Sequence, residues 1–428
     1  MRITEMHVTP IALGDPPLLN AAGLHAPYCL RTIVELETDN GLSGLAEVPG
    51  SVAVDQALAA VRETVIGSDP LNWHALRAKL AECCAPETSV ARGDKPWDGR
   101  TRVQVYSALD VACLDLQGKA FGVPVANLLG GVVRKRVPYS AYLFYKYEGA
   151  GGALAFGTEP GATGWAAARQ QAALDPDGIV AQAEAMVAEF GFESIKLKGG
   201  CFAPAEEVAA IHALRRRFGP GVPLRLDPNA LWSVETSIQW GRAMDGTLEY
   251  LEDPCRTQEG MAAVRRALKT PLATNMCTTS FDDLAGSVRL ASEDIILTDH
   301  HFWGGLRASM ELAAHCRTFG RGVSMHSNNH AGISLAAMTQ LGAAMPNLSY
   351  ALDTHYPWQS EEIIVGGRIQ FDGGCVVLPE GPGLGVELDR AALARAHATY
   401  RRAGLRERND EIEMQKKVPG WKFAQTRW

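Results

Sequence analysis

The sequence of 428 residues predicts an α/β protein: a modified (β/α)8, TIM-like barrel with an α+β capping domain formed from both chain ends. The barrel is predicted by short apolar runs of strand character that alternate with helical stretches from about residue 136 to 370. The cap is predicted by residues 2–12 and 32–48, which alternate apolar with polar side chains and turn at Asp39-Asn40-Gly41. The tail from residue 376 no longer alternates strand with helix, so we expect it to pack on the N-terminal part.

The predicted elements follow one another in a simple order. Residues 1–130 form the capping domain, with helical periodicity around 54–66 and 101–120 after the strands. Residues 131–372 form the barrel, in which the pattern leaves room for one helix to be lost or replaced, and 373–428 return to the cap. A stretch rich in Gly and Ala, 149–164, is expected to be a mobile loop. The barrel strand candidates are Val137–Phe144, Ser194–Lys198, Leu224–Asp227, Tyr250–Glu252, Leu272–Asn275, Ile295–Asp299, Gly322–His326 and Ala351–His355.

Composition and charge argue against several classes of function. A net charge of −7 and a pI near 5.9 disfavour a general nucleic-acid binder or a protein of anionic membranes. The first residues lack the apolar core of a secretory signal, and no apolar stretch approaches the roughly 18 residues that span a bilayer. Nine cysteines without a C-x-x-C pair indicate free thiols in a reducing compartment. We therefore expect a cytoplasmic protein with no nucleic-acid or membrane partner.

Residues capable of chemistry end one predicted barrel strand after another. A barrel gathers the C-terminal ends of its strands around one mouth, so residues far apart in sequence converge there. Taken alone, an Asp before a Pro is usually a turn or helix-cap residue, and two alternate lysines can be the solvated face of an edge strand. Seven consecutive strand ends of this kind make a shared site the better interpretation. The residues are Lys196 and Lys198, Asp227, Glu252, Asn275, Asp299, His326, and Asp353 with His355.

Three of these strand ends offer ligands for a metal ion. Asp227, Glu252 and Asn275 provide two carboxylates and one amide oxygen on neighbouring strands. Hard oxygen ligands of low total charge suit Mg²⁺, which keeps positions open for water or substrate. No cysteine joins them, which disfavours zinc.

Candidate bases flank this triad on both sides. Lys196 and Lys198 share a strand face, so each ammonium disfavours the charge of the other, which favours Lys198 as a base. On the far side, Asp299 can accept the far N–H of His326 and fix its tautomer. Two bases beside a divalent cation suit removal of the proton next to a carboxylate, because the enediolate that forms needs the cation's charge.

At these residues the chain resembles the enolase superfamily, within it the mandelate racemase group, and most closely the glucarate dehydratases. Asn275 on the fifth strand, together with His326-Ser327-Asn328-Asn329-His330, is specific to that branch. The chain departs from the family pattern at Pro96, where Thr is usual, and at His300, where Pro is frequent. The other matching motifs are Gly23-Leu24-His25-Ala26-Pro27, Lys196-Leu197-Lys198-Gly199-Gly200, Leu226-Asp227-Pro228-Asn229, Glu252-Asp253-Pro254-Cys255, Ala273-Thr274-Asn275-Met276, His301-Phe302-Trp303, Asp353-Thr354-His355 and Pro419-Gly420-Trp421.

The resemblance implies Mg²⁺-dependent dehydration of an acid-sugar diacid such as D-glucarate or L-idarate to a 5-keto-4-deoxy product. The implied steps are α-proton abstraction, stabilisation of the enediolate and β-elimination of water. Lys198 would be one base, and His326 with Asp299 the other, on opposite faces of the substrate. Asn328 would stand near the departing hydroxyl, and Lys196 and Asn229 would steady the enediolate. The substrate-binding residues implied are His25, Tyr142, Lys196, Asn229, Asn275, His326, Ser327, Asn328, His355 and Arg408.

Some alternatives stay open at this point. The fourth-strand metal ligand is either Glu252 or Glu259, because the family has a Glu-Gln pair where this chain reads Gln258-Glu259. The activity is either dehydration or racemisation (epimerisation), since two opposed bases suffice for inversion. The third hypothesis is a catalytically weakened homologue that only binds partners or acid sugars. We expect a small acid sugar as the partner and a homo-oligomer as the assembly.

Overall fold

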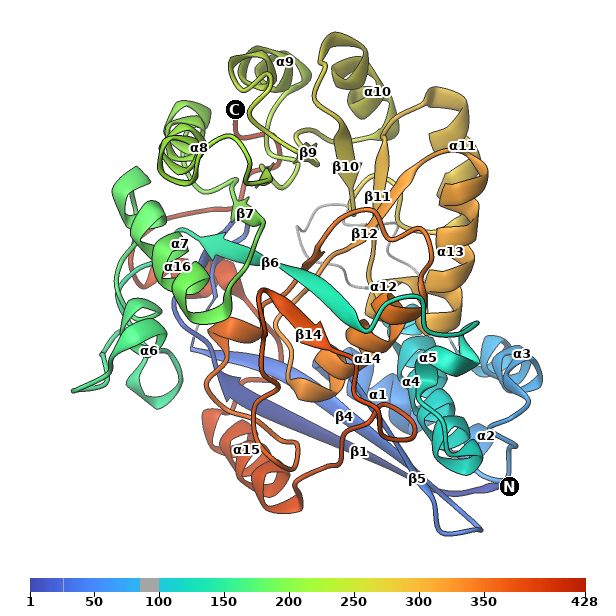
Figure 1. Ribbon diagram of the computed structural model, residues 1–428. Coiled ribbons are helices and arrows are strands. Elements are labelled where there is room, and N and C mark those ends of the chain that lie inside the picture. The colour runs from blue at the N-terminus through green and yellow to red at the C-terminus, as the bar shows by residue number, and fades with distance from the viewer. Residues whose placement is uncertain (26, 85–99) are drawn as a thin grey trace.

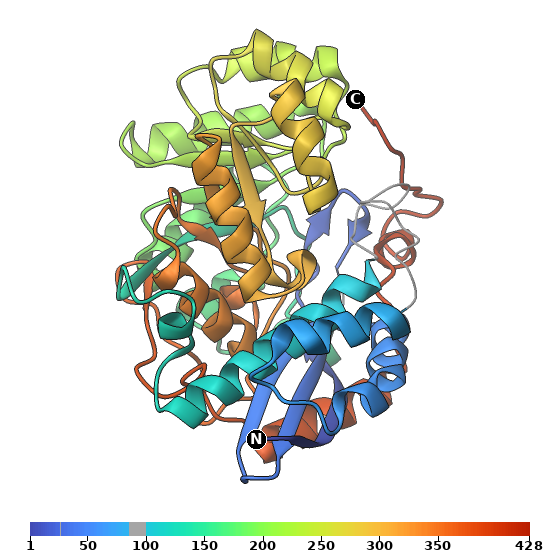
Figure 2. The ribbon, with the colours of Figure 1, turned by 90° about the vertical axis from the view of Figure 1, so that its right-hand side faces the viewer.

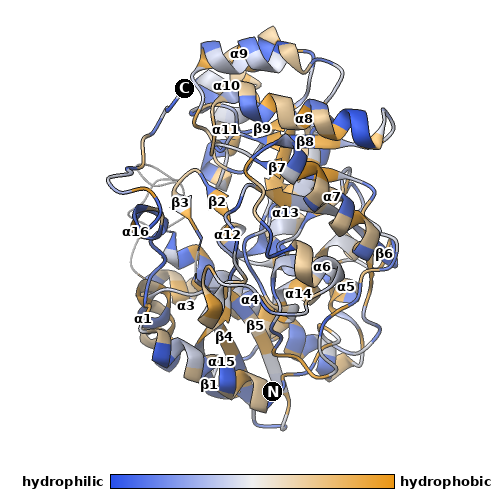
Figure 3. Cartoon of the chain, turned by 90° about the vertical axis from the view of Figure 1, so that its left-hand side faces the viewer, coloured by the Kyte–Doolittle hydropathy of each residue, from blue (hydrophilic) through white to orange (hydrophobic). Residues whose placement is uncertain are grey.

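A computed structural model describes residues 1–25, 27–84 and 100–428. It confirms the predicted fold class: a nearly closed parallel barrel lies against an α+β capping domain built from both ends of the chain (Figure 1). The barrel strands are hydrophobic and the helices around them carry hydrophilic residues outward, as expected for strands buried on both faces (Figure 3). None of the helices in the described ranges is both long and apolar enough to cross a membrane.

The capping domain is a three-stranded antiparallel sheet covered by helices. The sheet has the order β1-β4-β5, and the predicted turn at Asp39–Gly41 joins its last two strands. Helix α4 is buried along most of its length because it lies between this sheet and the barrel. A short ribbon, β2 with β3, projects toward the barrel mouth. The elements are β1 (Ile3–Gly14), β2 (Leu19–Asn20), β3 (Gly23–Leu24), β4 (Tyr28–Thr38), β5 (Ser43–Pro49), α1 (Val52–Ala60), α2 (Arg62–Val65), α3 (Trp73–Cys83), α4 (Thr101–Phe121) and α5 (Val125–Leu128).

All eight predicted barrel strands are present, and they are parallel to one another. Along the sheet they follow the order β12-β11-β10-β9-β8-β7-β6-β13. Each is only two to nine residues long, so a side chain at its C-terminal end stands at the rim of the barrel. The strands are β6 (Arg136–Phe144), β7 (Ile195–Lys198), β8 (Leu224–Asp227), β9 (Tyr250–Glu252), β10 (Leu272–Thr274), β11 (Ile295–Thr298), β12 (Gly322–Met325) and β13 (Leu352–Asp353).

Helices connect these strands on the outside of the barrel, except after the last one. There the chain makes only a single turn of 3₁₀ helix, Tyr356–Trp358, and then strand β14 (Cys375–Val377), which pairs antiparallel with β6. One barrel helix is therefore replaced, as the sequence allowed. The outer helices are α6 (Gly164–Ala168), α7 (Pro176–Phe190), α8 (Pro204–Phe218), α9 (Val234–Ala243), α10 (Gln258–Ala267), α11 (Phe281–Leu290), α12 (His300–Trp303), α13 (Leu306–Thr318) and α14 (Gly332–Ala344).

The tail returns to the cap, as expected. Helix α15 (Arg390–Ala403) packs on β1, and the ring of its His397 is bonded to the carbonyl of Pro10 at 2.7 Å. Helix α16 (Asp410–Gln415) packs on β3, and the last residues run up to the barrel (Figure 2). We propose domain boundaries near residues 130 and 372, in the connections that precede β6 and β14. The mobility of residues 149–164 stays a prediction.

Candidate active site

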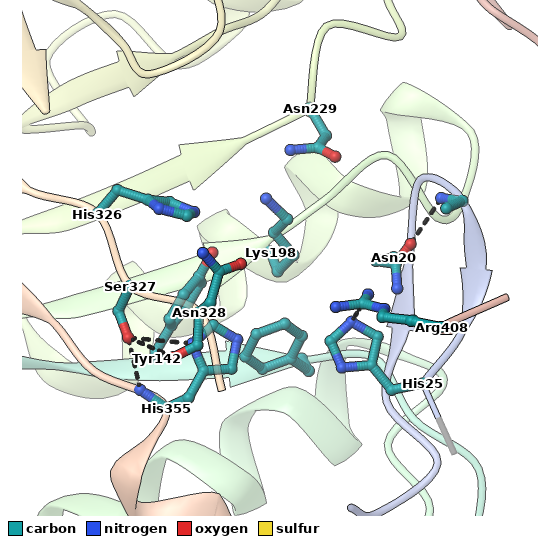
Figure 4. Close-up of a pocket in the computed structure, with 12 residues that line it drawn as sticks. Asn20, His25, Tyr142, Lys198, Asn229, His326, Ser327, Asn328, His355 and Arg408 are labelled. Carbon is teal, nitrogen blue, oxygen red and sulfur yellow. Dashed lines mark hydrogen bonds between the residues drawn. The ribbon is translucent and has the colours of Figure 1, made fainter. Parts of the chain in front are cut away.

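A cavity lies at the C-terminal ends of the barrel strands, beneath residues of the cap (Figure 4). The predicted substrate-binding residues line it, with the exception of Lys196 and Asn275, and the candidate base Lys198 lines it as well. Residues from both chain ends and from the barrel thus meet around one space, as the strand-end pattern predicts. The lining residues are Asn20, Ala22, His25, Tyr142, Phe144, Lys198, Asn229, His326, Ser327, Asn328, His355 and Arg408.

Asp227, Glu252 and Asn275 stand together at the ends of β8, β9 and β10. The amide nitrogen of Asn275 donates to Oε1 of Glu252 at 2.8 Å. Its oxygen Oδ1 is buried and has no hydrogen-bond partner among the described residues, an arrangement that costs about 1–3 kcal/mol unless something binds there. Glu259, in contrast, is an exposed residue in the first turn of α10.

Each carboxylate of this group contacts a lysine. Nζ of Lys198 lies 2.6 Å from Asp227. Nζ of Lys196 lies 2.5 Å from Glu252 and 2.6 Å from Asp353. Burial lowers the pKa of Lys196, but Asp353 and Glu252 more than offset this and hold the pKa well above its usual value. Lys196 is therefore a fixed positive charge beneath the cavity, and its predicted contact with substrate stays a prediction.

Asp227 and Glu252 lie close enough that the charge of Asp227 disfavours the ionised form of Glu252. Burial and then the charge of Asp227 raise the pKa of Glu252 well above its usual value. Burial also raises the pKa of Asp227, but Lys198 and Lys196 more than offset it and lower the pKa below its usual value. A divalent cation beside both groups would stabilise both ionised forms. Together with the unpaired Oδ1 of Asn275, these two adjacent carboxylates fit a hard cation such as Mg²⁺.

The candidate histidine base lies across the mouth from these lysines. Nδ1 of His326, directly after β12, is 3.0 Å from Oδ2 of Asp299, directly after β11. Burial raises the pKa of Asp299, but His301 and then His326 more than offset it, so the pKa lies well below its usual value. Asn328 also approaches Asp299, with its amide nitrogen 3.4 Å from Oδ2. Asp299 thus remains ionised and can hold a neighbouring imidazole in one orientation.

The remaining wall of the cavity carries aromatic and polar side chains. The rings of Tyr142 and His355 meet edge to face, with centroids 4.8 Å apart. Ser327 fixes the position of His355. The Ser327 hydroxyl oxygen is 3.1 Å from the backbone nitrogen of His355 and 3.3 Å from Nδ1 of its ring. Burial, and then the neighbouring His25, lower the pKa of His355 well below its usual value. His355 therefore faces the cavity as a neutral imidazole.

The end of the cavity far from the lysines is formed by the cap and the tail. Arg408 reaches His25 there, with a contact between Nη2 and Nε2 (Figure 4). However, Nε and Nη2 of Arg408 both donate to the carboxylate of Asp410, which is buried and also accepts from Asn20 at 2.7 Å. The two nitrogens with which Arg408 could bind a substrate carboxylate side by side are thus already bonded to Asp410. Only Nη1 of Arg408 makes no hydrogen bond among the described residues.

Several residues of the site were not predicted from the sequence. Phe144 ends β6 and lines the cavity, so the strand-end rule finds it once apolar residues are counted too. Asn20 lines the cavity from β2, and no pattern in the sequence marks it. The contact of Asp410 with Arg408 could not be predicted, because the sequence around Asp410 carries charges of both signs. Pro96, where the chain departs from the family pattern, lies outside the described residues.

Comparison with known proteins defines the class. Residues 25–130 match the model of the mandelate racemase / muconate lactonizing enzyme N-terminal domain, and residues 178–392 match the enolase C-terminal domain-like model. The chain therefore belongs to the enolase superfamily, which confirms the resemblance carried by its motifs. At the level of the family it stands among acid-sugar dehydratases and isomerases.

Individual relatives resemble this chain over nearly its whole length. The chain is 45% identical over 431 residues to a probable glucarate dehydratase of Streptomyces coelicolor, which covers 98% of this chain and 97% of the relative. An enolase of Thermobispora bispora, solved with magnesium and formate, is 50% identical, with a TM-score of 0.92 and full coverage of both chains. An enolase of Pseudomonas fluorescens, solved with magnesium, potassium and tartrate, is 45% identical, with a TM-score of 0.91 and coverage of 100% of this chain and 99% of that one.

The two candidates for the fourth-strand ligand predict different effects on metal binding. We expect Glu252→Gln to weaken Mg²⁺ binding by more than about 100-fold, since even the outer partners of metal ligands change affinity by about 10- to 100-fold. The exposed Glu259→Gln is the matched control and should bind Mg²⁺ as the unchanged protein does. Isothermal titration with Mg²⁺ after removal of metal by EDTA measures both. A loss of affinity in Glu259→Gln alone would assign the ligand to α10 instead.

Proposed function

We propose that the protein is a Mg²⁺-dependent hydro-lyase that dehydrates an acid-sugar diacid resembling D-glucarate or L-idarate. The observation that carries this proposal is that Lys198 on β7 and His326 after β12 line the same cavity. Of the four strands between them in the barrel, three end at Asp227, at Glu252 and directly before Asn275, whose side chains offer oxygen ligands. The 45% identity to a probable glucarate dehydratase supports the same reaction. The assembly as a homo-oligomer and the cytoplasmic location stay expectations.

The proposed roles follow from the contacts of each residue. Mg²⁺ held by Asp227, Glu252 and Asn275 would supply positive charge where the substrate carboxylate becomes an enediolate. Lys196, fixed between Glu252 and Asp353, adds a permanent positive charge beneath the same place. The side chain of Asn229 points into the cavity and can donate to the enediolate (Figure 4).

Proton transfer would be shared between two residues. Either Lys198 or His326 removes the proton from C5, depending on the configuration of the substrate at that carbon. The C4–O bond then breaks, and the departing hydroxyl takes a proton to leave as water. His326, protonated by the C5 proton where it is the base and from solvent where Lys198 is the base, can supply that proton, and Asn328 in the same cavity can hold the hydroxyl as it leaves. The enol that remains becomes the 5-keto-4-deoxy product.

Epimerisation is the second candidate, because two bases in one cavity can remove a proton on one face and return it on the other. A product test separates the two reactions. With Mg²⁺ and D-glucarate or L-idarate, we expect one keto group to appear for each substrate consumed, measured as a semicarbazone, with the loss of one water by mass spectrometry. Interconversion of the two acids without any semicarbazone would replace dehydration by epimerisation. Inactivity on a panel of hexarates, pentonates and hexonates would instead favour a homologue that only binds.

The two bases should act on different epimers. In deuterium oxide, we expect His326→Asn to lose exchange of the C5 proton in one epimer while Lys198 still exchanges the other. Lys198→Met should show the reverse, because each residue reaches the substrate from its own side of the barrel mouth. The measurement is the loss of the C5 proton signal by NMR. If both variants lost exchange on both epimers alike, one base would serve both faces.

Arg408 should favour substrates with a second carboxylate far from the metal. Its side chain is 36% exposed and two of its nitrogens hold Asp410, so one remaining charge-assisted hydrogen bond is worth about 1.5 kcal/mol. We therefore expect Arg408→Ala to lower kcat/KM about 10-fold on a diacid and to leave a monoacid of the same length unchanged. Steady-state kinetics on the matched pair gives both values. An equal loss on both acids would make Arg408 a structural residue of the tail.

A further inference from the structure

We propose that His301 is a positioning residue for His326, and that Arg31 of the capping domain holds His301 in the single neutral tautomer that this task needs. The inference rests on the proposed role of His326 as a base. It links that base, through His301, to the cap, whereas Lys198 contacts Asp227 of the barrel. The chain of contacts runs from Glu47 to Arg31, His301, Asp299 and His326.

Asp299 lies between two imidazoles and serves both. Its Oδ2 faces Nδ1 of His326 at 3.0 Å, and its Oδ1 faces Nδ1 of His301 at 2.8 Å. Oδ1 also accepts the backbone N–H of His301 at 2.9 Å, because Asp299 caps the short helix α12. His301 and Asp299 are only 2% and 3% exposed. Every bond in this group therefore forms away from solvent, where its geometry is fixed by the protein alone.

The contact with Arg31 fixes the tautomer of His301. Its Nη2 lies 3.2 Å from Nε2 of His301. A guanidinium only donates hydrogen bonds, so Nε2 must present its lone pair, and the hydrogen of a neutral His301 must then be on Nδ1. The hydroxyl oxygen of Ser334 lies 2.9 Å from the same Nε2 and accepts from Nη2 of Arg31 at 3.3 Å. A doubly protonated His301 would place an N–H against the guanidinium, which the contact opposes.

The position of Arg31 is fixed in turn by Glu47. Nε of Arg31 on β4 donates to Glu47 on β5 at 2.7 Å, and both side chains are buried. Glu47 also accepts the backbone N–H groups of Ala331 and Ser334 at 2.8 and 2.9 Å, at the start of α14. The cap thus places one charged pair against the barrel. Arg31 cannot move away from His301 without breaking these bonds.

The consequence for catalysis lies in the tautomer of His326. Because ionised Asp299 accepts from both imidazoles, the hydrogen of neutral His326 is held on Nδ1, and Nε2 is the nitrogen that would take the substrate proton. A His301 side chain that could not donate would leave Oδ1 of Asp299 with the backbone N–H of residue 301 alone, and would weaken the orientation of His326. Lys198 contacts Asp227 and takes no part in this chain. The effect on C5 proton exchange is therefore specific to one face of the substrate.

Two substitutions of His301 separate donation to Asp299 from contact with Arg31. The amide nitrogen of His301→Asn reaches the place of Nδ1 and can still donate to Asp299. The longer His301→Gln places its amide near Nε2, where it can accept from Arg31 but cannot donate to Asp299. We expect His301→Gln to slow C5 exchange of the epimer served by His326, and kcat on it, by about 10-fold or more, with little change in KM. His301→Asn should restore most of the loss, and exchange of the epimer served by Lys198 should stay unchanged in both.

Equal losses on both epimers, or no loss in His301→Gln, would overturn the proposal. A second measurement does not need turnover: ¹⁵N NMR of histidine-labelled protein reads the tautomer of each ring. His301 and His326, assigned from the variants that lack them, should both carry hydrogen on Nδ1, and His326 should lose this single form in His301→Gln. A wild-type His326 with hydrogen on Nε2 would also overturn it. If the wild type exchanges neither epimer but shows the expected tautomers, the proposed function fails and the positioning by His301 stands.

Discussion

The barrel mouth depends on the buried ammonium of Lys196. It contacts Glu252 on β9 and Asp353 on β13 at 2.5 and 2.6 Å and lies 3.8 Å from Asp227 on β8. None of these four side chains is exposed. Removing one member of such a group leaves an uncompensated buried charge, which costs about 3–5 kcal/mol. These ion pairs therefore fix the carboxylates relative to one another before any ligand binds, and they tie together strands that are not neighbours in the sheet.

The two sides of the cavity are supported in different ways. On one side, Lys198 rests on Asp227, so its position is set by the barrel strands and by the charges of the metal-ligand candidates. On the other side, His326 rests on Asp299, whose second oxygen is held by His301. Each base has its own anionic partner, and the two partners do not share a hydrogen bond among the described residues. Substitutions near one base can therefore change which face of the substrate loses its proton and leave the metal-ligand candidates in place. For the same reason, dehydration and epimerisation could both use this pair of bases.

The sequence predicted the strand ends well because the spacing of βα units is regular and a barrel brings those ends together. The sequence could not decide whether Glu252 or Glu259 is the fourth-strand metal ligand, because the two have the same side chain. They differ in burial, since the side chain of Glu252 is 0% exposed, and burial is visible only in the structure. The pairing of Arg408 with Asp410 could not be predicted either, because a neighbouring charge two residues away reads as ordinary surface polarity. His301 was visible as part of a motif. Its function as a donor to Asp299 depends on a guanidinium from the cap, 270 residues away in the sequence.

The cap contributes to the site through contacts that exist only when both chain ends are folded. Gly23 on β3 shows how closely they meet: a Cβ there would lie 2.3 Å from the carbonyl oxygen of Asp410, and its φ of +132° also favours glycine. This close approach brings His25 beside Arg408, 383 residues later. The far end of the cavity is thus built from the two least barrel-like parts of the chain. Changes there can alter which acid is held while the strand ends stay the same, and the contact of Arg31 with His301 links the cap to the histidine side of the site.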